Sequence, residues 1–302
     1  MRNEIFPEVQ PEVSFQQGDQ HESIKKARIY LDRLGYTQQA VMDAPMEELA
    51  TYDDDLNHAV TRFQKFFNLE VTGELDEPTR EMMSKPRCGV ADLNEDEPPP
   101  QPGVANYVAS SGAWSSHDLT YKFVNGTADL PGVIERDIVR QAFDVWANVT
   151  PLTFTEVTGS ADAVFLISWE IGDHGCGSPF DGPGHVLAHA FFPPPVNQHP
   201  GIAGDLHFDD QEVWSTTHGG NGDGSIDLLS VAIHELGHAL GLRHTNVPEA
   251  IMYPTYNGNR RTLDADDIAG IQSLYGKPGD PEEPWWKKTF KTILEWLLER
   301  FA

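Results

Sequence analysis

The chain has 302 residues, enough for two domains, and 39% of them are hydrophobic, as in globular rather than disordered proteins. Its formal net charge of -26 excludes the basic surface that phosphate binding requires, so we expect no nucleic-acid partner. With two cysteines, Cys88 and Cys176, a scaffold held together by many disulfides is also excluded. The sequence contains no apolar run long enough to cross a bilayer, and its first residues lack the apolar core of a signal peptide.

The N-terminal third carries helical patterns after an unpatterned start. Residues 1–20 have no apolar periodicity, and we expect them to form a flexible leader. From Glu22 onward, apolar residues recur at spacings of three and four, which predicts helices. Asp54 or Asp55 is expected to cap the second of them. The sequence therefore predicts an all-α unit of three helices over residues 21–92, with helices at 22–35, at 53–68 and from 76 onward.

A linker and a mixed region follow the helical unit. Residues 93–112 are acidic and then proline-rich, a composition that cannot build a core, so we expect an accessible linker where activating cleavage occurs. After it, short apolar runs are combined with an amphipathic helical pattern and a further expected helix near the end, which favours an α+β domain. The expected strands cover 119–124, 152–156, 163–169, 186–192 and 205–208, and the expected helices 133–148 and 264–275.

Residues 231–245, VAIHELGHALGLRHT, carry the pattern H-E-x-x-H-x-x-G-x-x-H. On a helix the first two histidines lie on one face, and the glycine permits the turn that returns the third one to the same ion. Three histidines with an open fourth position are typical of a catalytic zinc, which lowers the pKa of its water to about 7. The glutamate is placed to act as general base, so the pattern predicts a protease. The zinc ligands are His234, His238 and His244, and the base is Glu235.

Several stretches resemble the matrix metalloproteinases. Residues 63–79 (FQKFFNLEVTGELDEPT) resemble the helical prodomain of that family, which is itself similar to peptidoglycan-binding modules. Residues 86–92 (PRCGVAD) resemble its cysteine-switch motif, and 250–256 (AIMYPTY) its Met-turn. The resemblance covers about residues 22–276. It implies a metzincin-type catalytic domain at 113–276, with a five-stranded mixed sheet and three helices, behind the all-α prodomain.

The resemblance also assigns roles to residues around the zinc. Cys88 is implied to bind the zinc in a latent form, because a thiolate is a strong zinc ligand, while Arg87 pairs with Asp92. Met252 is implied to pack beneath the three histidines. The backbone at 187–190 is expected to bind substrate as an added antiparallel strand. Three residues would line the S1' pocket, which a small serine makes deep enough for Leu, Met or aromatic side chains: Ser230, Pro254 and Tyr256.

The segment from 173 to 210 resembles the region where the family binds a structural zinc. The implied ligands are His174, Cys176, His189 and His207, with Cys176 standing where the family has aspartate. Because thiolate suits zinc, we expect a site with one cysteine and three histidines. The alternatives are a weakened site, a free and oxidisable cysteine, or a disulfide with Cys88 that would remove the latency switch.

The same segment resembles the calcium loop of the family. Carboxylates and backbone carbonyls on a glycine-rich turn suit calcium, although an acidic surface loop is the alternative. The implied carboxylates are Asp181, Asp209 and Glu212, and the implied carbonyls those of Gly182, Gly184 and Val186. A second calcium site would use Asp205 and the carbonyls of Gly201 and Ala203.

Residues 277–302 form a linker and then an amphipathic pattern at 285–302, which is too short and too charged to span a membrane. We expect this helix to dock on the chain itself or a partner, with contact to a membrane surface as the alternative. We also expect no haemopexin-like domain. Together the patterns predict a latent, secreted and monomeric endopeptidase that cleaves extracellular proteins or peptides. The alternative is a catalytically silent module that binds glycans or proteins.

Overall fold

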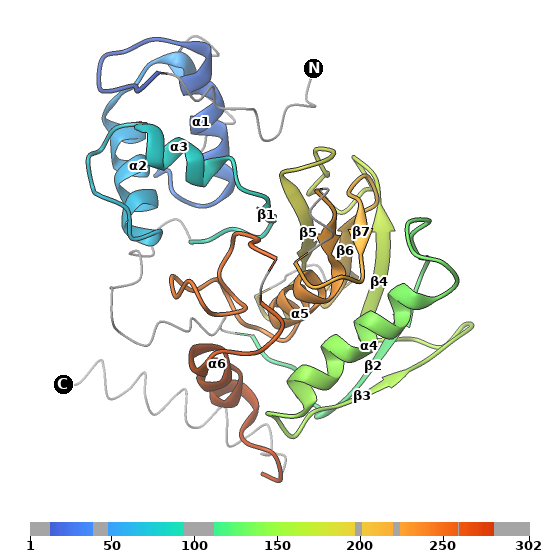
Figure 1. The fold of residues 1–302 in the computed structure, drawn as a ribbon. Helices are drawn as coiled ribbons and strands as arrows, with labels where there is room; N and C mark the ends of the chain where they lie inside the picture. Colours follow the sequence, from blue (N-terminus) through green and yellow to red (C-terminus); the bar gives the residue numbers. More distant parts are fainter. Residues whose placement is uncertain are drawn as a thin grey trace, which may run out of the picture.

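The computed structural model describes residues 13–38, 48–93, 112–196, 201–219, 224–258 and 260–280 (Figure 1). Most of the predicted leader, nearly all of the predicted linker at 93–112 and the whole amphipathic pattern at 285–302 lie outside these ranges. Within the described part of the chain, no helix is long and apolar enough to cross a membrane.

The predicted all-α unit is confirmed as a bundle of three helices around an aromatic core (Figure 1). Tyr36 packs edge-on against Phe63 and Phe66, and all three side chains are fully buried. This interior drives the packing, since aromatic side chains bury the largest apolar areas. The helices are α1 (Glu22–Arg33), α2 (Asp54–Phe66) and α3 (Glu77–Met83), with a short 3-10 helix, η2 (Glu48–Ala50), before α2.

The residue that caps α2 differs from the prediction. Asp53 has extended backbone and accepts a hydrogen bond from Leu56 N–H over 2.9 Å, so it is the N-cap. Asp54 and Asp55 already lie in the first helical turn, where their charge favours the helix dipole without capping. Asp53 also accepts a 2.7 Å hydrogen bond from Arg28 of α1, which ties the two helices together.

The catalytic part contains the predicted five-stranded mixed sheet, extended by a sixth strand. In the order β1-β5-β6-β4-β2-β3 every pair is parallel except β5 with β6. The additional strand, β1, comes from the helical unit and was not expected, because two residues are too short to show a strand period. The strands are β1 (Arg87–Cys88), β2 (Asp118–Phe123), β3 (Thr153–Glu156), β4 (Phe165–Glu170), β5 (Val186–Ala190) and β6 (Leu206–Asp209).

Three helices complete the catalytic part, as predicted: α4 (Ile134–Ala147), α5 (Leu228–Ala239) and α6 (Ala265–Tyr275). The indole of Trp146 on α4 is fully buried and donates to the carbonyl of Ile233 on α5 over 3.0 Å. On the side toward the sheet, Phe143 of α4 stacks on Tyr121 of β2. A two-stranded sheet of β7 (Trp214–Ser215) and β8 (Ile226–Asp227) leads directly into α5. The core therefore fixes α5 against both α4 and the sheet.

The end of α2 rests on the loop that follows the histidine helix (Figure 1). Phe67 packs edge-on against Tyr253, with ring centroids 5.7 Å apart. The next residue, Asn68, has a positive φ of 54° and donates its side-chain amide to the carbonyl of Asn246. The helical unit thus contacts the loop that follows α5.

Candidate active site

Helix α5 brings the three histidines of the pattern together. His234 and His238 lie on one buried face of α5, and Gly241, with a φ of 108°, turns the chain after the helix. This turn places Nε2 of His244 at 3.2 Å from Nε2 of His234 and 3.1 Å from Nε2 of His238. The three ring nitrogens thus converge on one point, where the sequence predicts a catalytic ion.

The donor set around that point fits zinc. Nitrogens that share one tetrahedral zinc lie about 3.4 Å apart, close to the separations found here. Sγ of Cys88 belongs to the same cluster, with all four donor atoms within 4.8 Å of one another. Burial lowers the pKa of His234 and of His238 well below the usual value, which keeps both rings in the neutral form that binds metals.

The outer nitrogens of the histidines also have partners. Nδ1 of His234 lies 2.6 Å from the carbonyl of Ile251, and Nδ1 of His238 lies 2.7 Å from that of Leu242. A proton on each Nδ1 leaves the Nε2 lone pair facing the ion. Nδ1 of His244 instead lies 2.7 Å from a carboxylate oxygen of Asp92.

Glu235 and Cys88 face one another inside this site. Glu235 is fully buried, and its Oε2 accepts a hydrogen bond from Sγ of Cys88 over 3.5 Å. Burial raises the pKa of Glu235 to about 8, and the bond from Cys88 opposes that rise. Burial, reinforced by the negative charge of Glu235, raises the pKa of the Cys88 thiol well above its usual value. The predicted base and the predicted latency ligand are therefore direct neighbours.

Met252 packs against α5 at Gly237. A side-chain carbon at Gly237 would lie 2.3 Å from Sδ of Met252, so only glycine permits this contact. Asp267 of α6 stabilises the turn at Met252, because its carboxylate accepts hydrogen bonds from the backbone N–H groups of Ile251 and Met252. Sequence reasoning missed Asp267, since its position at the start of α6 indicated only a helix cap.

The segment from Pro86 to Gly89 fills the cleft above α5. On one side Arg87 N–H donates to the carbonyl of His185, and Gly89 N–H to that of Ala188 on β5. On the other side Cys88 N–H donates to the carbonyl of Pro254, and Tyr256 N–H to that of Pro86. The segment runs parallel to β5, opposite to the direction expected for a substrate. It therefore covers the edge of β5 to which a substrate would add.

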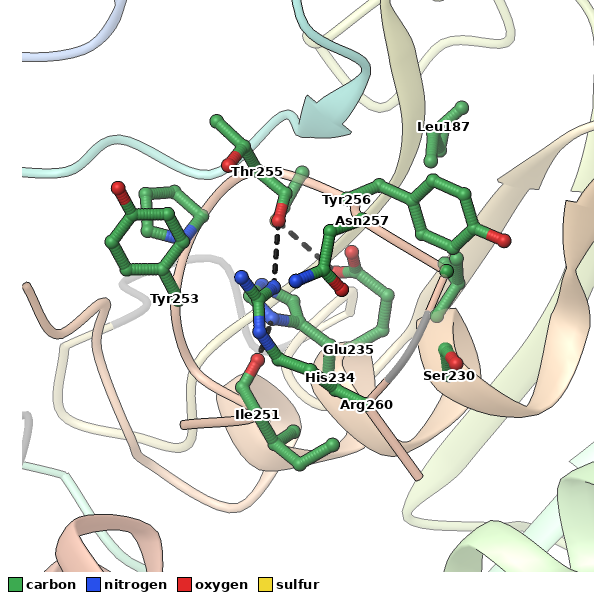
Figure 2. Close-up of a pocket in the computed structure, with 14 residues that line it drawn as sticks. Leu187, Ser230, His234, Glu235, Ile251, Tyr253, Thr255, Tyr256, Asn257 and Arg260 are labelled. Atoms are coloured by element: carbon green, nitrogen blue, oxygen red, sulfur yellow. Dashed lines mark hydrogen bonds between the residues drawn. The ribbon is translucent and has the colours of Figure 1, made fainter. Parts of the chain in front are cut away.

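A pocket opens beside Glu235 between α5 and residues 251–260 (Figure 2). The three residues predicted for the S1' pocket all line it. Ser230 donates its hydroxyl to Asp227, and the Tyr256 hydroxyl accepts the backbone N–H of Asp227. The free volume is about 30 Å³, enough for about two water molecules. Its lining comprises Cys88, Leu187, Ser230, Val231, His234, Glu235, Ile251, Tyr253, Pro254, Thr255, Tyr256, Asn257, Gly258 and Arg260.

Arg260 gives this pocket a cation that sequence reasoning did not find. Its Nε donates to the carbonyl of Pro248 over 2.8 Å. Its Nη1 donates to the carbonyl of Thr255 over 2.7 Å, and Arg260 and Thr255 are both labelled in Figure 2. Its guanidinium lies 4.9 Å from the ring centroid of Tyr253. No carboxylate among the described residues forms an ion pair with it, and burial lowers its pKa. The residue lies outside every motif, which explains why it was missed.

The four predicted ligands of the structural zinc also gather in one cluster. Sγ of Cys176 lies 2.9 Å from Nε2 of His174 and 3.5 Å from Nε2 of His189. Nδ1 of His207 lies 3.1 Å from both of these ring nitrogens. These separations suit one tetrahedral zinc with a sulfur and three nitrogen ligands. Both Cys176 and Cys88 are free in this structure, so the disulfide alternative is wrong for this state.

The carboxylates of the predicted calcium loop lie close enough to repel one another. Burial raises the pKa of Asp181 to about 6, that of Asp209 to about 6 and that of Glu212 to about 7. The charge of Asp181 raises the pKa of the other two further. One buried oxygen of Asp181 and one of Asp209 have no hydrogen-bond partner. Unpaired buried carboxylate oxygens on a turn with positive φ at Gly182 and Gly184 suit a hard cation.

The second calcium site has weaker support. Asp205 is buried, and its Oδ1 accepts a 3.3 Å hydrogen bond from Leu166 N–H. Burial raises its pKa to about 6, and within the described ranges no neighbouring carboxylate adds to that shift. Its predicted partners, Gly201 and Ala203, lie in the turn just before β6. This site stays a prediction.

Comparison with known proteins agrees with this geometry. A model of the matrixin family matches residues 113–276, and one of a putative peptidoglycan binding domain matches residues 20–83. The chain is 46% identical to matrix metalloproteinase-18 of Xenopus laevis, over 74% of this chain and 44% of that protein. It is 44% identical to the macrophage metalloelastase of Oryctolagus cuniculus, over 78% of this chain and 47% of that protein.

A shorter relative is covered more completely. The chain is 45% identical to matrilysin of Rattus norvegicus, over 71% of this chain and 74% of that protein. By contrast, the chain spans less than half the length of the first two relatives. Because the family model covers more than half of the chain and the histidines of its zinc pattern converge in the structure, the chain belongs to the matrixin family.

Proposed function

We propose that this protein is a latent zinc-dependent endopeptidase that cleaves extracellular proteins or peptides. One observation carries the proposal: three histidine nitrogens converge beside a buried glutamate, and the thiol of Cys88 completes the cluster. A zinc held by His234, His238 and His244 would polarise the scissile carbonyl and activate water. The remaining chemistry is assigned to side chains and backbone of the chain itself.

Glu235 is the proposed general base. It lies next to His234 on α5, so it faces the same space as the metal without being one of the three nitrogen ligands. In that position it accepts the proton of the attacking water and then delivers it to the leaving amine. Once the segment from Pro86 to Gly89 has left, the edge of β5 would bind the substrate backbone as an antiparallel strand, which would hold the scissile bond over Glu235.

Latency is assigned to the segment from Pro86 to Gly89. Its backbone pairs with β5 on one side and with the Pro254–Tyr256 stretch on the other, so substrate and segment compete for one site. Cys88 would occupy the fourth zinc position, which an attacking water needs. Removal of this segment, by cleavage within 93–112, would therefore expose the base, the metal and the cleft together.

The pocket lined by Ser230, Pro254 and Tyr256 is assigned as S1'. It adjoins Glu235, so a side chain that follows the scissile bond would enter it. Its small volume in the latent state means that lining side chains have to separate before Leu, Met or an aromatic residue is admitted.

We further propose a structural zinc at His174, Cys176, His189 and His207, and a calcium ion at Asp181, Asp209 and Glu212 with the carbonyls of Gly182, Gly184 and Val186. Both sites border β5, the strand whose edge the substrate would join, and its neighbour β6. Their ions would stiffen the loops around the substrate strand. A secreted location agrees with calcium binding, and we propose that the protein acts as a monomer.

The test compares three chains after release of the helical unit by limited proteolysis: wild type, Glu235→Gln, and Asp162→Asn as a surface control. We expect Glu235→Gln to lose peptide hydrolysis by about 10²- to 10⁴-fold while it keeps its zinc, and the control to match wild type. Equal hydrolysis by Glu235→Gln would overturn the mechanism. If zinc-loaded wild type hydrolyses none of a broad panel of peptides, the silent binding module is favoured instead.

A further inference from the structure

The carboxylate of Asp92 lies at the centre of a buried polar cluster. Its Oδ1 accepts a hydrogen bond from Nη2 of Arg87 and lies 2.7 Å from Nδ1 of His244. Its Oδ2 accepts the hydroxyl proton of Tyr36 over 2.8 Å. The side chains of Asp92 and His244 are fully buried. Two partners of this carboxylate thus belong to the helical unit, and the third is a predicted zinc ligand.

This contact distinguishes the third histidine from the other two. His234 and His238 have backbone carbonyls of the catalytic part beside Nδ1, at Ile251 and Leu242. These partners stay in place when the helical unit leaves. Nδ1 of His244 has only Asp92 beside it among the described residues, and Asp92 belongs to the segment that is released.

We infer that Asp92 is a positioning residue for the catalytic zinc, and that its carboxylate holds His244 with Nε2 turned toward the ion. This inference rests on the proposed function. A carboxylate that accepts the outer N–H of a metal-bound histidine fixes the tautomer and the ring plane, and raises the basicity of the ligand nitrogen. The released segment therefore supplies two contacts to the zinc centre: Cys88 directly, and Asp92 through His244.

The other partners of Asp92 explain how a buried carboxylate is held there. Arg87 neutralises its charge, and Tyr36 satisfies the oxygen that faces away from His244. Arg87 also donates through Nε to the carbonyl of Cys88, which links the carboxylate to the residue that faces the metal. Release of the segment removes the whole cluster at once. We therefore expect the latent chain to retain zinc more firmly than the chain without the segment does. The contact between zinc and the Cys88 thiol should account for only part of this difference.

The test uses the full, uncleaved chain loaded with zinc, and measures the rate at which a chelator removes the ion. Substitution of Asp92 alone would leave Arg87 buried without a counter-charge, so both are replaced in Arg87→Met/Asp92→Leu, which removes the pair without leaving a charge. We expect zinc from the catalytic site to be lost about 10- to 100-fold faster than from wild type. All variants carry Cys176→Asp, so that Cys88 is the one thiolate that can bind cobalt at either proposed site, and the thiolate band of the cobalt-substituted chain then shows whether the segment is still in place.

Each result then has one meaning. Faster loss with the thiolate band intact supports the inference, and an unchanged rate with the band intact overturns it. Arg87→Met alone is the matched control: it keeps Asp92 beside His244, and we expect slower loss than from the double variant. If wild type holds no zinc on the three histidines, the proposed function itself fails, which this design separates from a failure of the inference.

If Arg87→Met/Asp92→Leu releases the segment from the cleft, a spectroscopic measurement tests the inference instead. In the zinc-loaded latent chain, nuclear magnetic resonance should show the Nδ1 proton of His244 displaced downfield by the carboxylate. Arg87→Met/Asp92→Asn keeps an acceptor of the same shape, removes its charge and leaves no buried guanidinium without a counter-charge. We expect the His244 signal to move upfield in this variant while those of His234 and His238 stay in place. An unmoved His244 signal would overturn the inference.

Discussion

Sγ of Cys88 donates a hydrogen bond to Oε2 of Glu235 over 3.5 Å, and the same sulfur lies in the cluster of three histidine nitrogens. One side chain of the helical unit therefore meets both the proposed base and the proposed metal position. Neither could act on a substrate while this contact persists. We therefore expect the proposed latency to depend on the side chain of Cys88 as well as on the backbone pairing around it.

The first prediction concerns that side chain. Cys88→Ser in the uncleaved chain should raise basal peptide hydrolysis by about tenfold or more, because a hydroxyl binds zinc more weakly than a thiolate does. Cys176→Ser is the matched control and should leave the uncleaved chain silent. Hydrolysis is measured before any proteolysis. If Cys88→Ser stays as silent as wild type, the backbone pairing of Pro86 to Gly89 is sufficient for latency.

The second prediction concerns the zinc content of the chain. Wild type should bind two zinc ions and Cys176→Ser only one, because a zinc at His174, His189 and His207 would lose its thiolate ligand. Cys176→Asp should restore the second ion, since aspartate is also a zinc ligand. Metal analysis after exhaustive dialysis measures the content. A single zinc in the wild-type chain would reject the structural site.

The third prediction concerns calcium. Saturating calcium should raise the melting temperature of the chain, with about 2.7 kcal/mol of stabilisation when its concentration is 100 times the dissociation constant. Asp181→Asn should reduce this shift, because the variant removes a carboxylate with an unpaired buried oxygen. Asp162→Asn, on the exposed surface, is the control and should keep it. A full shift in Asp181→Asn would place calcium elsewhere.

The fourth prediction concerns substrate choice at Arg260. Its Nη2 makes no hydrogen bond to a described residue, so it can donate to an oxygen of the side chain in the S1' pocket. Arg260→Met should lower kcat/KM for peptides with Gln at P1', relative to matched peptides with Leu, by about tenfold. Arg140→Met, which changes the same charge at a surface ion pair, should leave the ratio unchanged. An equal ratio in Arg260→Met would exclude this contact.

The fifth prediction concerns the pH dependence of the helical unit. Burial raises the pKa of Asp53, but the Leu56 N–H and the Arg28 guanidinium outweigh it, so the net pKa is lowered. A lowered carboxyl pKa adds stability above about pH 4, and this stability disappears as the pH falls through the folded-state value. Asp53→Asn keeps the cap but loses the ion pair, which is half exposed, at a cost of about 0.5 kcal/mol at pH 7.

The urea concentration at which Cys88 becomes reactive toward a thiol reagent measures this cost. We expect Asp53→Asn to lower that concentration at pH 7 and to match wild type at an acidic pH below the lowered pKa of Asp53, because its carboxyl group is then protonated. Asp53→Ala loses the cap as well, at about 1 kcal/mol in all, and should stay below wild type at both pH values. A difference between Asp53→Asn and wild type that is equal at both pH values would show that the charge of Asp53 has no role.

The amino-acid sequence by itself determined which segments form most of the helices and strands, and which histidines are the predicted ligands of the catalytic zinc. Apolar spacing predicted α1, α2, α4 and the five strands of the catalytic sheet, because that spacing reflects the face that each element buries. The other α-helices of the described residues were predicted from a proline at the first turn, from the histidine pattern and from the family resemblance. A single helix, α5, fixes the relative positions of His234, Glu235 and His238, so their geometry follows from their spacing in the sequence. The cap of α2 was misplaced by one or two residues, since three consecutive aspartates offer the same side chain.

Only the tertiary structure decided which distant groups meet. Nothing in the spacing of residues places Asp92 beside His244, Arg260 in the pocket or Asp267 under the Met-turn. The strand at Arg87 and Cys88 also exists only because β5 offers an unpaired edge. Such contacts depend on how the helices and strands pack against one another. The spacing of apolar residues shows which face of an element is buried, but not which residues its ends and loops will contact.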